Sequence, residues 1–201
     1  MSWDVDGTLY ALPQLVRAMY GLYAKRLIDP QFVQNLREIT KLWQYRRSMA
    51  RVRSAGGKID AETAKVIMAK DMAAEQRWYG QAIQSIGPRP GIVETIQRID
   101  EVGIRQVVIS DYVCDYKLRA LGMGHCFERL FAGEELGMLK PSPELFLSVA
   151  PKIGVTPEQI LHIGDRADTD GVAAQKAGCK SLILGDNDPL DFLIRTDSRR
   201  P

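Results

Sequence analysis

Acidic residues gather in two short segments that lie far apart in the chain. Asp4 and Asp6 alternate in the run Asp-Val-Asp-Gly-Thr-Leu, and a second run, Gly-Asp-Arg-Ala-Asp-Thr-Asp, carries Asp165, Asp168 and Asp170. Carboxylates brought to one point repel one another unless a cation neutralises them, and hard oxygen ligands favour Mg²⁺. If the fold joins the two segments, the sequence predicts a magnesium site.

The positions of these acids relative to predicted strands indicate that the two segments meet. In an extended segment alternate residues point the same way, so Asp4 and Asp6 can converge on one site, and Gly7 lets the chain turn beside a ligand. The second segment follows the apolar run at residues 160–163. Ligands of open parallel sheets bind at the carboxyl ends of the strands, which is where both segments lie.

Two more polar groups are expected at the same edge of the sheet. Ser110 ends the apolar run at residues 106–110, where a hydroxyl and backbone N–H groups could hold a phosphoryl oxygen. Lys140 lies in a loop just before a predicted helix and adds a cation. The predicted site therefore contains both signs of charge.

The elements that position these residues alternate after about residue 90. Buried strands are predicted at residues 106–110, 130–132, 160–163 and 181–184, and helices at 91–102, 115–121, 143–153 and 170–177. This alternation predicts an α/β fold with a parallel sheet covered on both faces. Only three residues precede Asp4, whereas a central strand usually has about five or six; either this strand is short or the true start lies upstream.

Residues 11–86 show apolar residues at helical spacing and no convincing strand. We expect a helical insert, with a turn at residues 54–58 between two long helices and a hinge at residues 87–91. The predicted organisation is a catalytic core of residues 1–10 and 87–201 with a helical cap of residues 11–86 inserted after the first strand.

Four motifs occur in order along the chain: the Asp-x-Asp-Gly-Thr-Leu run, the strand-ending Ser110, Lys140 before Pro141, and the Asp165 to Asp170 segment. Together they resemble the motifs of the haloacid dehalogenase superfamily, in its helical-cap, phosphoglycolate-phosphatase-like branch. The resemblance covers the chain from Trp3 to about Gly185. It implies a doubly wound, Rossmann-like sheet with an inserted α-helical cap.

The resemblance also implies roles for these residues. Asp4 would be the nucleophile that forms an aspartyl-phosphate, and Asp6 the acid and base. Phosphate-binding residues would be Ser110, Asp111 and Lys140. Magnesium would be held by Asp4, the backbone carbonyl of Asp6, and Asp165, with Asp170 either a ligand or a support that grips Lys140 or a bound water.

The acid at position 6 distinguishes reaction types within this superfamily, because the dehalogenase branch implies a non-acidic residue there. A halide leaves without a proton, whereas an alkoxide leaving group needs one. The chain departs from the common pattern at Asp111, Ser142 and Ala173, where asparagine, aspartate and glycine are common. These departures concern the substrate rather than the chemistry.

Several residues have simpler interpretations. Asp111, Asp115 and Asp168 are expected to cap helices. His162, in an apolar strand, is expected to be a core residue with its hydrogen bonds satisfied, and His125 beside Cys126 falls short of a closed zinc site.

The basic run from Arg37 to Lys58 is interpreted as the solvated face of a cap helix, with attraction of an anionic substrate as the alternative. Trp43 and Tyr45, within that run, are expected in the core.

Composition restricts the class of protein. A net charge of +2 is too mild for a typical nucleic-acid binder, and no apolar run is long enough to span a bilayer. Three widely spaced cysteines and the lack of an N-terminal leader indicate a cytoplasmic protein.

The expected function is a magnesium-dependent phosphatase acting on a small phosphorylated metabolite. The alternatives are a phosphosugar mutase of the same family and a non-catalytic interaction protein with a basic cap.

Overall fold

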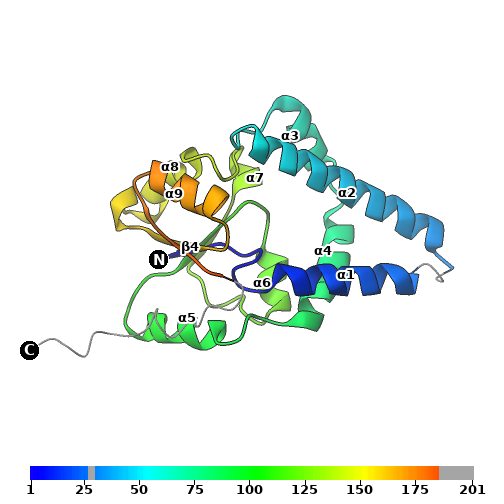
Figure 1. Cartoon of the computed structure of the whole chain (residues 1–201), viewed down its shortest axis with the longest axis horizontal. Coiled ribbons are helices and arrows are strands. Elements are labelled where there is room, and N and C mark those ends of the chain that lie inside the picture. The colour runs from blue at the N-terminus through cyan, green and yellow to red at the C-terminus, as the bar shows by residue number, and fades with distance from the viewer. Residues whose placement is uncertain (27–29, 186–201) are drawn as a thin grey trace, which may run out of the picture.

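A central parallel sheet with helices on both faces forms the body of the protein (Figure 1). The computed structural model describes residues 1–26 and 30–185. Residues 186–201, which the sequence assigns to the core, lie outside the described residues. Four helices extend from the body on one side, and they come from residues 12–86.

The sheet has five strands in the order β3-β2-β1-β4-β5. They are β1 (Ser2–Trp3), β2 (Val107–Ser110), β3 (Arg129–Ala132), β4 (Leu161–Gly164) and β5 (Lys180–Ile183). Every pairing is parallel. The chain moves outward from β1 in one direction to β3 and then in the other to β5, so the predicted doubly wound, Rossmann-like sheet is confirmed.

The central strand β1 is only two residues long, yet it is paired on both sides. Ser2 lies opposite Val107 of β2 and His162 of β4. The Asp4 N–H extends this pairing by donating to the Ile163 carbonyl at 2.8 Å. A strand of two residues is therefore enough to fix the position of Asp4 at the carboxyl end of the sheet.

Helices on the two faces of the sheet bury two separate apolar clusters. Val108 of β2 belongs to the cluster that includes Trp3, whereas its neighbours Val107 and Ile109 belong to the cluster that includes Phe146. This alternation follows from the period of two in a strand. The covering helices are α5 (Ile92–Glu101), α6 (Asp115–Ala120), α8 (Glu144–Val149) and α9 (Val172–Lys176), with short turns α7 (Gly133–Leu136), η1 (Ala150–Ile153), η2 (Pro157–Gln159) and η3 (Ala167–Gly171).

The segment predicted as a cap contains α1 (Leu12–Arg26), α2 (Phe32–Ser54), α3 (Ala61–Met68) and α4 (Met72–Ile86). The turn predicted at residues 54–58 does follow α2, but the helix after it, α3, has 8 residues and is not long as predicted. Tyr45 is buried as expected, whereas Trp43 is 67% exposed and was placed in the core wrongly. The action of this segment as a separate cap stays a prediction.

Charged contacts and a backbone bridge between Lys58 and Met138 join the cap segment to the core. The buried Lys70 Nζ lies 3.1 Å from Glu75 of α4 and 2.9 Å from Glu134 of α7. Tyr45 of α2 donates a hydrogen bond to the same Glu134. These contacts fix how α2 and α4 face the carboxyl ends of the strands.

Candidate active site

Asp4 lies at the carboxyl end of β1, at the centre of the sheet, and is 5% exposed. Val5, between the two acids, is fully buried in the core, which aims Asp4 and Asp6 away from that core. Gly7 follows with φ +98°, a conformation that favours glycine. The local sequence thus presents two carboxylates before the chain turns into α1.

The structure brings together acids from both predicted segments. Carboxylate oxygens of Asp4, Asp165 and Asp170 lie within 4.8 Å of one another. Burial raises the pKa of Asp4 well above its usual range, and the neighbouring acids Asp170 and Asp165 raise it further against the opposing effect of Lys140. Three close hard-oxygen donors whose own charges are unfavourable together are a set suited to a divalent cation.

Lys140 is the cation within this acid cluster. Its Nζ donates to Asp4 Oδ1 at 2.5 Å, to Asp170 Oδ1 at 2.6 Å and to the Ile109 carbonyl at 3.3 Å. Burial alone would raise the pKa of Asp170, but Lys140 and His162 hold it well below its usual range. Of the two predicted roles of Asp170, gripping Lys140 is the one that these contacts show.

The carboxylate of Asp165 reaches the acid cluster by packing directly against Gly7. A Cβ on Gly7 would lie 2.1 Å from Asp165 Oδ2, so no other residue fits there without displacing this carboxylate. Burial, followed by the charge of Asp170, raises the pKa of Asp165 to about 6. Gly164 leaves similar room for Asp170, because a Cβ there would lie 2.4 Å from its Cγ.

Asp6 faces a different environment from Asp4. The fully buried Lys117 donates to Asp6 Oδ1 at 2.7 Å and to Oδ2 at 2.6 Å, and the Tyr10 hydroxyl also donates to Oδ1. Burial would raise the pKa of Asp6, but Lys117 and then Arg46 lower it to about 2. In this state Asp6 is an ionised carboxylate held by a lysine, ready to accept a proton only when that contact loosens.

Ser110 and Asp111 end β2 beside this cluster and are buried. The Ser110 hydroxyl accepts a hydrogen bond from the Tyr112 N–H at 3.3 Å. Asp111 Oδ1 accepts from the Lys140 N–H at 2.9 Å, so its carboxylate ties together the two loops that carry Ser110 and Lys140.

Three of the acids expected to be helix caps are not caps. The N-cap residue of α6 is Cys114, and Asp115 instead pairs with Arg119 on the surface. Asp168 lies within η3 and pairs with Arg166. Asp111 joins loops, as described above. The expectation failed because local sequence does not show which turn residue precedes the first helical hydrogen bond.

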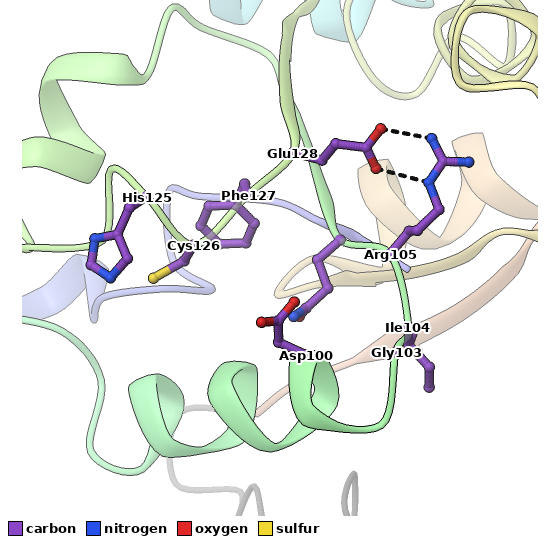
Figure 2. Close-up of a pocket in the computed structure, with 9 residues that line it drawn as sticks. Asp100, Gly103, Ile104, Arg105, His125, Cys126, Phe127 and Glu128 are labelled. Atoms are coloured by element: carbon purple, nitrogen blue, oxygen red, sulfur yellow. Dashed lines mark hydrogen bonds and ion pairs between the residues drawn. The ribbon is translucent and has the colours of Figure 1, made fainter.

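Both histidines match their simpler interpretations in part. His162 is fully buried between the Ser2 hydroxyl (3.0 Å) and Asp170 (3.2 Å), so it is a satisfied core residue, and it supports the carboxylate that grips Lys140. His125 and Cys126 line a hollow at the amino ends of the strands, far from Asp4, together with the ion pair of Arg105 and Glu128 (Figure 2). The three cysteines are unpaired.

Residues that sequence reasoning missed lie on the Asp6 side. Lys117, Tyr10 and Tyr112 contact Asp6 or each other, and Arg46 and Arg53 come from the basic run that was interpreted as solvated. Arg37, Lys41, Arg47, Arg51 and Lys58 of that run are exposed as expected. The apolar stripe of α2 indicates which face packs but not that two arginines turn inward.

The chain is similar in sequence to known hydrolases. A family model described as haloacid dehalogenase-like hydrolase matches residues 2–178. A glyceraldehyde 3-phosphate phosphatase of Methanopyrus kandleri is 28% identical over 217 residues, covering 99% of this chain and 89% of that protein. A phosphoglycolate phosphatase of Pasteurella multocida is 26% identical over 193 residues, covering 92% and 84%.

Solved structures share the fold. A predicted phosphoglycolate phosphatase from Haemophilus somnus matches with a TM-score of 0.60 and 25% identity, covering 96% of this chain and 89% of that one. A HAD-hydrolase of Bacillus subtilis, YfnB, described as bound to magnesium, matches with a TM-score of 0.63 at 19% identity, covering 94% and 89%. Within the described residues of our chain, no helix has the length and apolar character to cross a membrane.

Proposed function

The chain belongs to the haloacid dehalogenase-like hydrolase family, and we propose that it is a magnesium-dependent phosphatase that hydrolyses a small phosphomonoester through an aspartyl-phosphate on Asp4. The observation that carries the proposal is the meeting of Asp4, Lys140, Asp165 and Asp170 at the carboxyl ends of β1 and β4. The names of the curated relatives support the same reaction type.

The acid cluster fits a divalent cation in its donor chemistry. Asp4, the Asp6 backbone carbonyl and Asp165 would hold Mg²⁺, with Asp170 beside them. The bound ion would neutralise negative charge on the phosphoryl group. Burial first, and then the neighbouring negative charges, raise the pKa of Asp4 and of Asp165, and a bound cation would favour their ionised forms.

Asp4 is the nucleophile of the proposed reaction. One of its oxygens attacks phosphorus, the ester P–O bond breaks, and the phosphoryl group moves to Asp4. Lys140 holds Asp4 in position and opposes the rise in its pKa, and Ser110 at the end of β2 would hold a phosphoryl oxygen. The phosphate-binding role of Asp111 would be indirect, through the Lys140 backbone.

Asp6 completes the cycle by moving protons. The contact with Lys117 must first loosen so that Asp6 takes up a proton; Asp6 then donates it to the departing alkoxide and afterwards accepts one from the water that attacks the aspartyl-phosphate. The leaving group is therefore bound on the side of Asp6, beneath α2 and α4. Because Asp4, Ser110 and Lys140 are almost completely buried, we propose that α1–α4 move as a lid to admit substrate and then exclude water.

Phosphate release from a panel of phosphomonoesters, with and without Mg²⁺, tests the proposed function. Wild-type protein should release phosphate only with Mg²⁺, and Asp4→Asn should release none. Asp115→Asn is a matched control, because this acid pairs with Arg119 on the surface. Isomerised sugar phosphate without free phosphate would indicate a mutase instead, and no turnover by wild type on any ester would refute the proposal.

A further inference from the structure

One buried glutamate of the core contacts both the cap helices and the loop that follows β2. Glu134 lies in α7, where the body meets α2 (Figure 1), and its side chain is 1% exposed. Its Oε1 accepts a hydrogen bond from the Val113 N–H at 2.7 Å, and its own N–H donates to the Asp111 carbonyl at 2.9 Å. Glu134 therefore holds both ends of the three-residue segment that comes directly after Ser110.

The cap supplies a cation and a hydroxyl to the same carboxylate. Lys70, between α3 and α4, places its Nζ 2.9 Å from Glu134 Oε1 and 3.1 Å from Oε2. The Tyr45 hydroxyl of α2 also donates to Oε2, and the Tyr45 ring meets that of Tyr112 edge-on, with centres 6.0 Å apart. Two parts of the cap thus reach the loop after Ser110 through one side chain of the core.

The contact between Lys70 and Glu134 is an ion pair shielded from water. The side chain of Lys70 is 4% exposed, and that of Glu75, its second acidic partner at 3.1 Å, is fully buried. Burial removes hydration from both charges, and their attraction offsets this cost only while they stay in contact. Water returns to both charges when the two surfaces separate. An ion pair at this boundary can therefore open more readily than an apolar contact of the same area.

The ion pair lies apart from the groups that would do chemistry. Within residues 1–26 and 30–185, neither Lys70 nor Glu134 makes a hydrogen bond or ion pair with Asp4, Asp6 or Lys140. Any effect of this pair on turnover must therefore pass through the position of the cap or of the loop that Glu134 holds.

We propose that the ion pair of Lys70 with Glu134 is a latch that couples closure of the cap helices to the position of the Ser110 loop. Lys70 belongs to the cap and Glu134 to the core, so the pair exists only while the cap lies on the core. Lys70 and Glu134 are then positioning residues, which act through the loop rather than on the substrate. This inference rests on the proposed phosphatase function and assigns its lid movement to two named residues.

The first test compares steady-state kinetics of full-length variants with Mg²⁺, on the ester of the panel that wild type hydrolyses with the highest kcat/KM. Lys70→Met leaves Glu134 buried without its cation, which opposes closure. kcat/KM should fall at least about tenfold, mainly through KM, because apparent affinity falls with the fraction of closed enzyme. Lys65→Met removes an exposed lysine of α3 and should leave both constants unchanged.

A neutral pair separates loss of the charge pair from loss of packing. Glu134→Gln alone should raise KM as Lys70→Met does, and it provides the comparison if Lys70→Met does not fold. In the double variant Lys70→Met/Glu134→Gln, the glutamine carbonyl can still accept from the Val113 N–H, and Glu75 keeps its contact with Arg46. The KM of the double variant should return to within about threefold of wild type, because a buried ion pair can often be replaced by uncharged groups with little loss.

Hydrogen–deuterium exchange gives a readout that does not depend on turnover. Lys70→Met should speed exchange of the amides of residues 111–113 by at least about tenfold, the change expected for about 1.4 kcal/mol of lost protection. Amides of β4 should exchange as in wild type, since that strand lies in the centre of the sheet. The double variant should restore protection of residues 111–113.

The latch is refuted if wild type is active and Lys70→Met keeps its KM, or if exchange rises equally in β4 and in residues 111–113. Failure of the double variant to recover KM also refutes it, because the loss would then come from packing. Inactivity of wild type on every ester is a distinct result: it refutes the phosphatase proposal, and with it any role of the latch in turnover.

Discussion

Two buried lysines divide the site into two halves whose electrostatics differ. Lys140 binds Asp4 and Lys117 binds Asp6. Lys140 lies between Asp4 and Asp170, with Asp165 nearby, and acids outnumber cations. Lys117 pairs with Asp6 and the nearby Arg46 pairs with the buried Glu75, so cations and acids balance. The pKa of Asp4 is raised and that of Asp6 is lowered to about 2, although the two residues are separated only by Val5.

The difference indicates which half requires a further ion. Negative charge is in excess on the Asp4 side, which suits a metal cation, whereas on the Asp6 side each carboxylate already has a cationic partner. Each prediction below changes one half and leaves the other in place.

Removal of the nucleophile should have the largest effect. Asp4→Asn should lower kcat by more than about 10⁴-fold, because covalent catalysis fails entirely when the attacking group is lost. The loss should be equal for alkyl and aryl phosphates, since both need the same attack. Steady-state kinetics with the two ester types measure it, and a loss confined to one type would contradict a common nucleophile.

Removal of the proton donor should have a smaller effect that depends on substrate. Asp6→Asn should lower kcat for an alkyl phosphate by about 10²- to 10⁴-fold, the usual contribution of general acid–base catalysis. The transfer step with p-nitrophenyl phosphate should suffer less, because its leaving group departs without a proton. A burst of nitrophenol measures that step. Equal losses of rate for both esters would show that Asp6 does not protonate the leaving group.

Steric crowding beside Asp165 should weaken Mg²⁺ binding without changing the contacts of Lys117. Gly7→Ala forces a Cβ to within 2.1 Å of Asp165 Oδ2 at φ +98°, with a strain of about 1 to 3 kcal/mol. Titration calorimetry should show at least tenfold weaker Mg²⁺ binding, a figure of about 1.4 kcal/mol.

The matched control for this variant is Gly21→Ala in α1. That position has nothing within 4 Å of an added Cβ and should bind Mg²⁺ as wild type does. Unchanged affinity in Gly7→Ala would mean that Asp165 is not a ligand.

The smallest predicted effect is a pH dependence of the metal-free protein. The pKa of Asp165 is about 6 when folded against an ordinary 3.8, so between these values the native state binds more protons than the unfolded state. Stability in a chelator should therefore fall as pH rises from about 4 to 6.

Urea unfolding at several pH values measures this trend. Asp165→Asn should make the fall shallower, and Mg²⁺ should offset it in wild type, because the ion favours the ionised carboxylate. If neither Asp165→Asn nor Mg²⁺ alters the slope of stability against pH, the ionisation of Asp165 is not the cause of the pH dependence.

The two halves also differ in how far the sequence reveals them. Asp4, Ser110, Lys140, Asp165 and Asp170 each follow a strand or lie in a short motif, and parallel strands bring such positions to one edge. Their meeting was therefore predictable from local patterns, as was the doubly wound sheet.

Lys117, Tyr112 and Arg46 lie on helices or in loops whose neighbours are set by how α2 and α4 pack on the core. The spacing of Leu42 and Met49 places Tyr45 and Arg46 on the packed face of α2 and Trp43 and Arg47 away from it, but it does not show that Arg46 reaches the ring of Tyr112 in the core. The Asp6 side of the site depends on tertiary contacts, and only the structure locates it.

The most direct test of the account is to trap the phosphorylated enzyme. Asp6→Asn with p-nitrophenyl phosphate and Mg²⁺ should form the aspartyl-phosphate but hydrolyse it slowly, because the base that activates water is missing. Acid quenching followed by peptide mass spectrometry should find one added phosphoryl group on Asp4. Turnover without any phosphorylated peptide, or with the phosphoryl group on another residue, would contradict the account.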